Sequence, residues 1–266
     1  MQRTDALTLA DAVFPRIEAG GRAAALARDL LLMIGFAGLV ALCAQIAIRT
    51  PWTTVPITGQ TFAVLVAGGS LGAWRGAGSL SIYMLMGMIG IPAFAPGSSE
   101  VTGTWAMHFI LPWDGTSALP WNISSGGYIV GFILAAALVG YLAERQWDRK
   151  PWVHLAMLLG NAVLYIPGIL WLAYLISTDW VPGGATKPLG EFISGSGTWN
   201  KALSGGLYPF IVGDLMKLIL ASLTLPAAWS LVDRFGRTAR LGGEKKPGEP
   251  PLREPQSAAP EPREPA

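Results

Sequence analysis

Asp214 and Lys217 are the residues whose types and spacing most strongly suggest chemistry, because both are charged and lie inside a long apolar segment. Their separation of three residues places both side chains on one face of a helix, within reach of each other. A charged side chain near the centre of a bilayer costs about 2.5–3.5 kcal/mol on insertion scales. The pair therefore predicts a functional site. The alternative is an ion pair that only neutralises itself and fixes helix packing.

Asn161 and Tyr165 form a second polar pair, four residues apart in another apolar segment. Both side chains fall on one helix face, and both can donate and accept hydrogen bonds. Each needs a partner once it is removed from water. Two interpretations stay open, hydrogen bonding between helices and contact with a ligand.

Two further segments begin with residues suited to a ligand. Thr58 and Gln60 open one of them, and we expect Thr58 to cap a helix and Gln60 to contact a ligand. Gly127 and Tyr128 open another, where the glycine permits close backbone approach. Tyr128 offers a ring and a hydroxyl to a ligand, although a place in the interfacial aromatic belt fits it equally well.

The residues that would indicate other chemistries are absent or misplaced. His108 and His154 stand alone, without partners at metal-ligand spacing, so we expect neither a metal nor a covalently bound cofactor. A Gly-x-Ser-x-Gly string at 68–72 lies in an apolar segment and not on a strand-to-helix turn, and there is no Walker A sequence. A net charge of +2 with scattered basic residues gives no case for nucleic acid. The protein is therefore not expected to be an enzyme.

The elements that must position these residues are membrane helices. The chain is 52% hydrophobic and only 14% charged, against roughly 25% charged residues in soluble domains. A window matched to the bilayer core predicts an all-α integral membrane protein, a bundle of six transmembrane helices. The six segments are approximately Leu30–Ile48, Thr58–Ala73, Ala77–Ile91, Gly126–Ala143, Val153–Ser177 and Gly206–Val232, with a tight turn at residues 74–76.

Lys and Arg residues predict the orientation. Most of them fall on one side of these segments, and only Arg49, Lys187 and Lys201 fall on the other. The positive-inside rule then places both termini in the cytoplasm. Residues 1–29 are expected to form a cytoplasmic or interfacial lead, residues 30–237 the six-helix membrane domain, and residues 238–266, rich in Pro, Glu and Arg, a disordered cytoplasmic tail.

The loops on the opposite side predict a cavity. The loop at residues 49–56 contains two prolines, the loop at 92–125 has no Lys or Arg, and the loop at 178–205 is rich in Gly. Lipid offers no hydrogen bonds to such irregular backbone, so it must face protein or a cavity. A binding site open to the outer face follows.

Five motifs, in order along residues 30–233, resemble the BioY family, the biotin-specific substrate-binding (S) components of energy-coupling-factor (ECF) transporters. They are Val-Pro-Ile-Thr-Gly-Gln-Thr at 55–61, Gly-Met-Ile-Gly-Ile-Pro-Ala-Phe at 87–94, Gly-Gly-Tyr-Ile-Val-Gly-Phe at 126–132, Gly-Asn-Ala at 160–162 and Gly-Asp-Leu-Met-Lys at 213–217. Two features depart from the family pattern: Ser124-Ser125 replaces a usual Pro-Thr, and residues 105–121 lengthen the third loop.

The resemblance implies a biotin pocket near the outer face, shaped by the first and third loops and the last three helices. It implicates Asp214 and Lys217 in ligand binding. We expect Lys217 to meet the biotin carboxylate or to orient Asp214, and Asp214 with Asn161 to meet the ureido group. Tyr165, Tyr128, Gln60 and Gly127 complete the expected set of ligand-binding residues.

The resemblance also implies partners and a location. Family members associate with a transmembrane coupling subunit and ATPase subunits, and Ala37 and Ala41 on the first helix form a small-residue pair suited to that contact. The expected location is the bacterial cell (inner) membrane, crossed several times. Whether the protein needs the energising module stays open.

Three other readings remain. One is an S component for another vitamin, against which the paired motifs at 55–61 and 213–217 argue. The second is an intramembrane enzyme that uses Asp214, Lys217 and Tyr165 as acid and base groups. The third is a structural membrane subunit.

Overall fold

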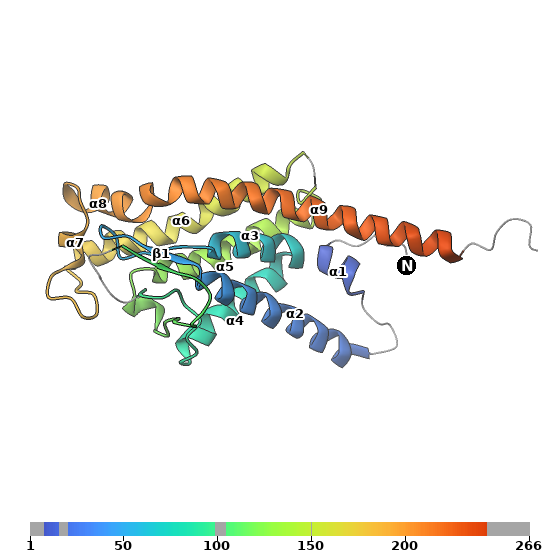
Figure 1. Ribbon diagram of the computed structural model, residues 1–266, viewed down its shortest axis with the longest axis horizontal. Coiled ribbons are helices and arrows are strands. Elements are labelled where there is room, and N and C mark those ends of the chain that lie inside the picture. Colours follow the sequence, from blue (N-terminus) through green and yellow to red (C-terminus); the bar gives the residue numbers. More distant parts are fainter. Residues whose placement is uncertain (1–7, 16–20, 99–104, 150, 244–266) are drawn as a thin grey trace, which may run out of the picture.

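The computed structural model describes residues 8–15, 21–98, 105–149 and 151–243, and helices dominate this part of the chain (Figure 1). The principal helices are α2 (Gly21–Ala44), α3 (Gln60–Leu71), α4 (Ala73–Met88), α5 (Gly126–Ala143), α6 (Val153–Ser177) and α9 (Ile211–Gly243). Short helices α1 (Leu9–Val13), α7 (Leu189–Phe192) and α8 (Gly197–Gly206) and two 3₁₀ turns, η3 (Pro120–Asn122) and η4 (Tyr208–Phe210), accompany them.

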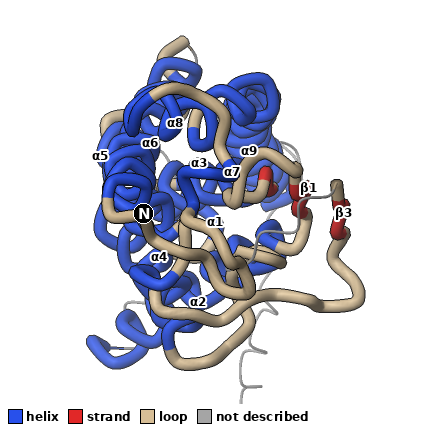
Figure 2. Tube along the Cα trace, turned by 90° about the vertical axis from the view of Figure 1, so that its left-hand side faces the viewer, coloured by secondary structure: helices blue, strands red, loops and turns tan. Residues whose placement is uncertain are grey.

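The helices form one bundle with α3 near its centre, and α5 on one side packs against α3, α4 and α6 (Figure 2). Small residues permit these close contacts. A β-carbon at Gly131 on α5, for example, would overlap the backbone of Leu164 on α6. Helix association within a bilayer depends on such close packing, because lipid tails are as apolar as the side chains themselves.

Within the described part of the chain, four helical segments are long and apolar enough to cross a membrane: Gly21–Ala44, Gly126–Ala143, Val153–Ser177 and Gly197–Phe235. The six-span prediction is therefore met only in part, since α3 has 12 residues and α4 has 16. Every residue of α3 except Phe62 is buried. A helix enclosed by protein needs neither the length nor the exposed apolar face of a lipid-facing span.

The expected turn at residues 74–76 is helical, and the chain breaks only at Gly72. This glycine has φ +85° and separates α3 from α4. Positive φ is costly for other residues, and a β-carbon here would also contact Glu144 and Thr8. The third helix therefore begins at Ala73, four residues earlier than the sequence indicated.

The first span ends at Ala44 rather than Ile48, because the residues that follow enter a small sheet. Its strands are β1 (Ala47–Arg49), β2 (Ile57–Thr58) and β3 (Ala106–His108), in the order β2-β1-β3, and both pairings are antiparallel. Ala47 pairs with Thr58 on one side and with His108 on the other. The sheet joins the first and third loops and satisfies backbone groups that would otherwise be exposed.

The last helix differs from its prediction at both ends. Helix α8 ends at Gly206, Leu207 forms a turn, and Pro209 lies in the 3₁₀ turn η4, so α9 begins at Ile211. It continues to Gly243, into the segment expected to be a disordered tail. The rest of that tail, residues 244–266, lies outside the described residues, as do residues 1–7 and 16–20 of the N-terminal lead.

Ala37 and Ala41, the expected partner surface on the first helix, are buried in the core at 0% and 2% exposure. They pack inside the bundle, so neither can contact another subunit, and that prediction is wrong. These small residues do permit close packing, but against other helices of this chain.

Helix α1 is held against the bundle by an ion-pair network. Arg75 of α4 contacts Asp11 of α1 at 2.7 Å and Asp29 of α2 at 3.2 Å, and Arg28 contacts both carboxylates at 2.8–2.9 Å. Thr8 caps α1 through the Asp11 backbone and also accepts a hydrogen bond from Arg75. This network, α1 and the far end of α9 lie at one end of the molecule, while α7, α8 and β1 lie at the other (Figure 1).

Candidate ligand-binding pocket

A hollow lies between α3, α4, α5, α6 and α9 at the end that carries the small sheet. Its accessible volume is about 50 Å³, smaller than that of a typical small-molecule site, so the hollow must widen to admit a ligand of that size. Val55 and Pro56 of the first loop and Phe94, Ala95 and Ser98 of the third loop form part of its wall. The expected cavity under these two loops is therefore present.

Asp214 is the polar centre of the hollow and is only 3% exposed. Its Oδ1 accepts hydrogen bonds from Lys217 Nζ at 2.7 Å and from Thr61 Oγ1 at 3.4 Å. Its Oδ2 accepts from the Tyr165 hydroxyl at 2.6 Å. Three elements, α3, α6 and α9, thus converge on one carboxylate. Such satisfaction by several donors is what allows a charge to stay buried.

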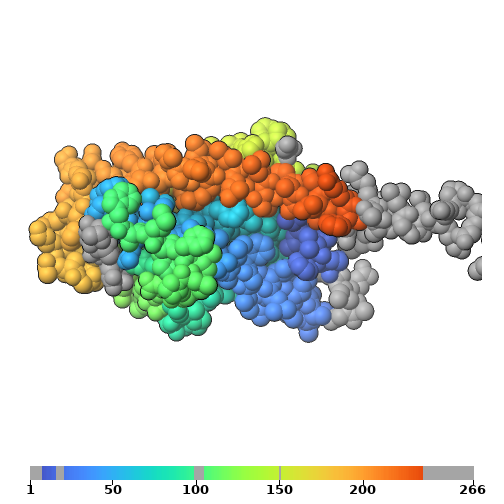
Figure 3. Space-filling view, viewed as in Figure 1, coloured from blue at the N-terminus to red at the C-terminus, as the bar shows by residue number. Residues whose placement is uncertain are grey.

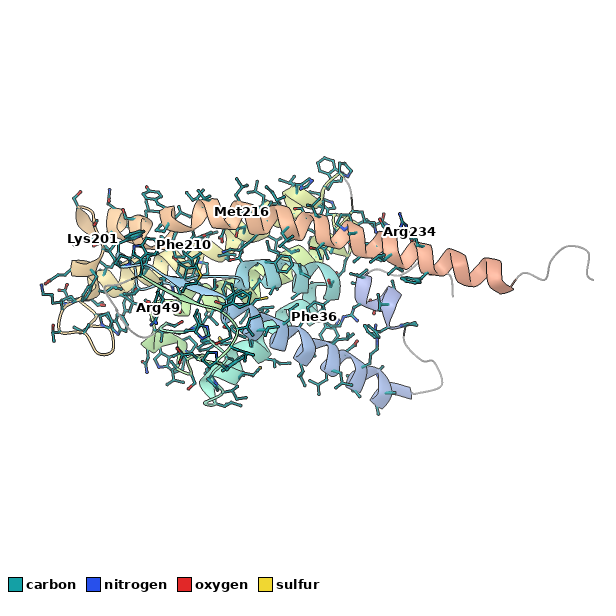
Figure 4. All side chains as sticks on the ribbon, viewed as in Figure 1. Phe36, Arg49, Lys201, Phe210, Met216 and Arg234 are labelled. Carbon is teal, nitrogen blue, oxygen red and sulfur yellow. The ribbon has the colours of Figure 1, made fainter. Side chains whose placement is uncertain are left out.

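Lys217 lies beside the carboxylate and lines the same hollow, with its side chain 17% exposed. An ammonium group has three donors, and the described contacts use one of them, on Asp214. The lysine therefore orients Asp214 and keeps donors available toward the hollow. Figure 4 shows the contrast along α9, where Met216 projects away from the bundle and Phe210, just before the helix, lies on the hollow side.

Gln60 begins α3 and forms a second polar group on the wall. Its Nε2 donates to the Tyr83 hydroxyl at 2.6 Å, and its Oε1 accepts from Thr58 Oγ1 at 2.8 Å. Tyr83 and Thr61 also line the hollow, and sequence reasoning missed both. Nothing in the sequence indicates that Tyr83 meets Gln60. Thr61, in contrast, belongs to the motif at 55–61.

Aromatic rings form the apolar wall. Tyr128 and Tyr165 meet edge to face with centroids 6.0 Å apart, and Tyr83 meets Phe94 in the same way at 5.4 Å. The Tyr128 hydroxyl donates to the Gly206 carbonyl at 2.7 Å, which ties α5 to the end of α8. Tyr128 therefore presents its ring, and not its hydroxyl, to the hollow.

Two of the expected ligand-binding residues lie outside the wall of the hollow. Asn161 is on α6 but does not line it, and its Oδ1 is buried without a hydrogen-bond partner among the described residues. Gly127 does not line it either. Its backbone instead lies against Trp171 and the Pro167 carbonyl, so it sets the distance between α5 and α6.

Gly127→Ala is expected to destabilise the protein and weaken ligand binding together, although residue 127 does not touch the hollow. The added methyl would overlap the Pro167 carbonyl, so α6 would have to shift and carry Tyr165 with it. Overpacking of this kind costs about 1–3 kcal/mol. Thermal unfolding in detergent and ligand titration would measure both effects.

Gly35→Ala is the matched control for that variant. Gly35 lies in α2, and a β-carbon there would meet no atom within 4 Å among the described residues. Alanine is favoured over glycine within helices, so this variant should be as stable as the parent or slightly more so. Equal behaviour of the two variants would contradict a packing role for Gly127.

The first and third loops are fastened to the bundle at several points. Thr53 Oγ1 donates to the Gly205 carbonyl of α8, and Ser124 Oγ donates to the Thr54 carbonyl at 3.4 Å. The added length of the third loop is also anchored, since Trp105 packs edge to face on Trp52 at 4.8 Å. The loops therefore form a cover that must loosen before a ligand can enter.

Comparisons with known proteins agree with one another. The model of the BioY family matches residues 16–234. A probable biotin transporter BioY from Pyrococcus horikoshii is 30% identical over 73% of this chain and 92% of its own length. A biotin transporter BioY from Rhizobium etli is 32% identical over 74% of this chain and 90% of its own.

A solved structure supports the fold. The crystal structure of the S-component for biotin from an ECF-type ABC transporter superposes with a TM-score of 0.56. It covers 77% of this chain and 92% of that protein, at 20% sequence identity. At that identity the likeness concerns the fold alone, and it covers most of both chains.

Proposed function

The chain belongs to the BioY family, and from this premise we propose that it binds biotin in the hollow around Asp214, as the substrate-capture component of biotin uptake. The observation that carries the proposal is the Asp214 carboxylate, buried but satisfied by donors from three elements on the wall of that hollow. The relatives are named as transporters. They give no support to an enzyme that uses Asp214, Lys217 and Tyr165 as acid and base groups.

The chemistry of biotin suits the wall. The N–H groups of its ureido ring donate hydrogen bonds, and a carboxylate such as Asp214 is a strong acceptor for them. Its bicycle needs apolar surface, which Tyr128, Phe94 and Phe210 supply. We assign Lys217 first to orienting Asp214, because that contact is formed at 2.7 Å. Its remaining donors are then free for the ligand.

Some polar side chains on the wall are hydrogen-bonded to each other, and these bonds must break before the side chains can bind the ligand. Gln60 and Tyr83 bond to each other across α3 and α4, and both line the hollow. We infer that Gln60 contacts the ligand, as its position at the start of α3 suggested. Asn161 is a less direct candidate, because its side chain would have to reach the hollow from a position outside the wall.

We also propose the orientation in the membrane. The described ends of the chain lie at the end of the bundle opposite α7, α8 and β1 (Figure 1), and the hollow lies toward the end that carries β1. With the basic residues gathered near those ends, the positive-inside rule places both termini in the cytoplasm and the hollow toward the outside of a bacterial cell membrane. In this arrangement α3 and α4 complete six crossings as enclosed or short helices. A transmembrane coupling subunit and ATPase subunits then act from the cytoplasmic side.

A biotin titration of the full-length protein in detergent tests this function. We expect submicromolar binding, with riboflavin and thiamine failing to compete, and mass spectrometry should recover unaltered biotin from the complex. Competition by another vitamin would identify an S component of different specificity, and altered biotin would identify an enzyme. No binding at millimolar biotin would rule the proposal out.

A further inference from the structure

A second concave surface lies far from the hollow, between the start of α6 and the middle of α9. Its volume is about 480 Å³, and its polar lining residues are Arg149, His154, Ser222, Ser230 and Asp233. The loop from α5 to α6 (yellow-green) lies beside α9 (orange) in the space-filling view (Figure 3). We call this surface the α6–α9 groove. Nothing in the proposed biotin site uses it.

The floor of the α6–α9 groove contains an unsatisfied polar group. Ser222 is 1% exposed and lines the groove, yet its hydroxyl has no hydrogen-bond partner among the described residues. Buried polar groups are normally satisfied by a partner, and this hydroxyl lies directly beneath the groove without one.

One wall of the groove is a fixed cation. The Arg149 guanidinium lies 3.9 Å from the centroid of the Trp229 ring, and the Trp229 indole N–H donates to Asp148. Stacking and the hydrogen bond hold both side chains in place. Arg149 Nε is buried and lies 3.9 Å from the Asp148 carboxylate, an ion pair without a hydrogen bond. The guanidinium is thus positioned before any ligand arrives, and the Arg149 side chain is still 36% exposed.

The charges around the groove have both signs. Arg149 and the exposed His154 can donate to a phosphate, while the exposed Asp233 would repel it. A head group that carries a phosphate and an ammonium together satisfies both ends, the phosphate at Arg149 and the ammonium at Asp233. A head group with only phosphate and hydroxyl groups would place its negative charge near the Asp233 carboxylate without a cation to balance it.

The surroundings indicate a lipid rather than a soluble phosphate. The groove lies where the apolar α6 begins, and its lining includes Leu223, Pro226 and Ala227. Leu155 and Leu158 of α6 are exposed just beyond it. Trp147 and Trp152 stack with centroids 5.5 Å apart at the same level, as aromatic residues do at a membrane interface. An acyl chain could therefore follow the apolar faces while the head group occupies the groove.

We propose that the α6–α9 groove binds one phosphatidylethanolamine molecule, with its phosphate on Arg149 and His154 and its ammonium on Asp233. The bound lipid fastens the start of α6 to the half of α9 that lies beyond Asp214 and Lys217. Positively charged recesses between membrane helices are known to bind lipid head groups. Here the added carboxylate selects a head group that carries an ammonium.

Native mass spectrometry of the delipidated full-length protein tests the proposal with dioleoyl phosphatidylethanolamine, phosphatidylglycerol and phosphatidylcholine, and with free O-phosphoethanolamine. We expect phosphatidylethanolamine to bind at least about tenfold more tightly than phosphatidylglycerol. Arg149→Gln should weaken its binding by a similar factor. Asp233→Asn lies on an exposed rim and should remove the preference between the two lipids while the fold stays intact.

Arg145→Gln is the matched control. Arg145, like Arg149, follows α5 and stacks on an aromatic ring, with its guanidinium 3.4 Å from the centroid of Tyr141. Arg145 does not line the groove. This variant should bind phosphatidylethanolamine as the parent does. Circular dichroism and thermal unfolding would show that each variant is folded. Equal lipid binding by Arg149→Gln and Arg145→Gln, or an unchanged preference in Asp233→Asn, would overturn the proposal. Binding of free O-phosphoethanolamine as tight as that of the lipid would overturn the membrane source.

Discussion

Asp214→Asn is expected to weaken biotin binding by about 100-fold or more, which corresponds to about 2.8 kcal/mol. The substitution keeps the shape of the side chain but removes the charge on which Lys217, Tyr165 and Thr61 converge. Charged acceptors form hydrogen bonds roughly twice as strong as neutral ones. Isothermal titration of the purified variant with biotin would measure the loss, and unchanged binding would contradict the assignment of this hollow as the biotin site.

The Lys217→Met variant distinguishes between two roles for Lys217, orienting Asp214 and binding the biotin carboxylate. The biotin methyl ester lacks the carboxylate charge and is the probe. If Lys217 acts by orienting Asp214, as the 2.7 Å contact indicates, the variant should bind biotin and its methyl ester with equal losses. A loss for biotin alone would instead place Lys217 on the biotin carboxylate and overturn the orienting role.

The double variant Asp214→Asn/Lys217→Met provides a control for stability. Lys217→Met alone leaves a carboxylate that is 3% exposed without its cation, and breaking a buried pair costs about 3 kcal/mol or more. Removing both charges avoids that penalty. The double variant should therefore unfold at a higher temperature than Lys217→Met while still failing to bind biotin. The two losses should not add, since the residues form one unit.

Arg75→Met is expected to cause the largest loss of stability, about 3–5 kcal/mol. Arg75 and Asp29 are each 4% exposed, and Arg75 also contacts Asp11 of α1 at 2.7 Å. Methionine would fill the volume but would leave these carboxylates short of their main cation. Thermal unfolding in detergent would show the loss, and hydrogen exchange should show that α1 is released from the bundle.

The Arg75 network also predicts a dependence on pH. Burial alone would raise the pKa of the Asp11 carboxyl, but hydrogen bonds from Arg75, Thr8 and Arg28 outweigh that effect and lower the pKa below its ordinary value. A carboxyl with a lowered pKa in the folded state adds stability above its unfolded pKa and loses it as pH falls through the folded value. Protection of α1 should therefore be constant at neutral pH and decline only in acid.

Arg22→Met is the matched control for Arg75→Met. Arg22 is an exposed arginine in the first turns of α2, near the same end of the molecule. Exposed charges contribute about 0–1 kcal/mol at most, so the control should unfold as the parent does. Similar destabilisation by the two substitutions would mean that the network does not hold α1.

Much of the site was accessible from the sequence, for reasons that are local. Charged residues in an apolar segment are energetically costly wherever they lie, so Asp214 and Lys217 are conspicuous in the sequence. Their separation of three residues places the two side chains in contact on one helix face. Tyr165, Tyr128 and Gln60 also line the hollow, and their contact with a ligand stays a prediction. Gly127 and Asn161 show the limit of this reasoning, because a helix face predicted from spacing does not say which neighbour it meets.

The sequence by itself thus determined the class of protein, a helical membrane protein with a charged pair, and the family motifs that identify its relatives. Only the tertiary structure decided which residues from distant segments share a contact. Tyr165 reaches Asp214 from 49 positions away, Gln60 reaches Tyr83, and Arg75 joins α1 and α2. Periodicity in the sequence predicts one element at a time, whereas these contacts depend on how nearly uniformly apolar helices pack together. Small residues such as Gly127 and Gly131 control that packing, because they set the distance between helix backbones.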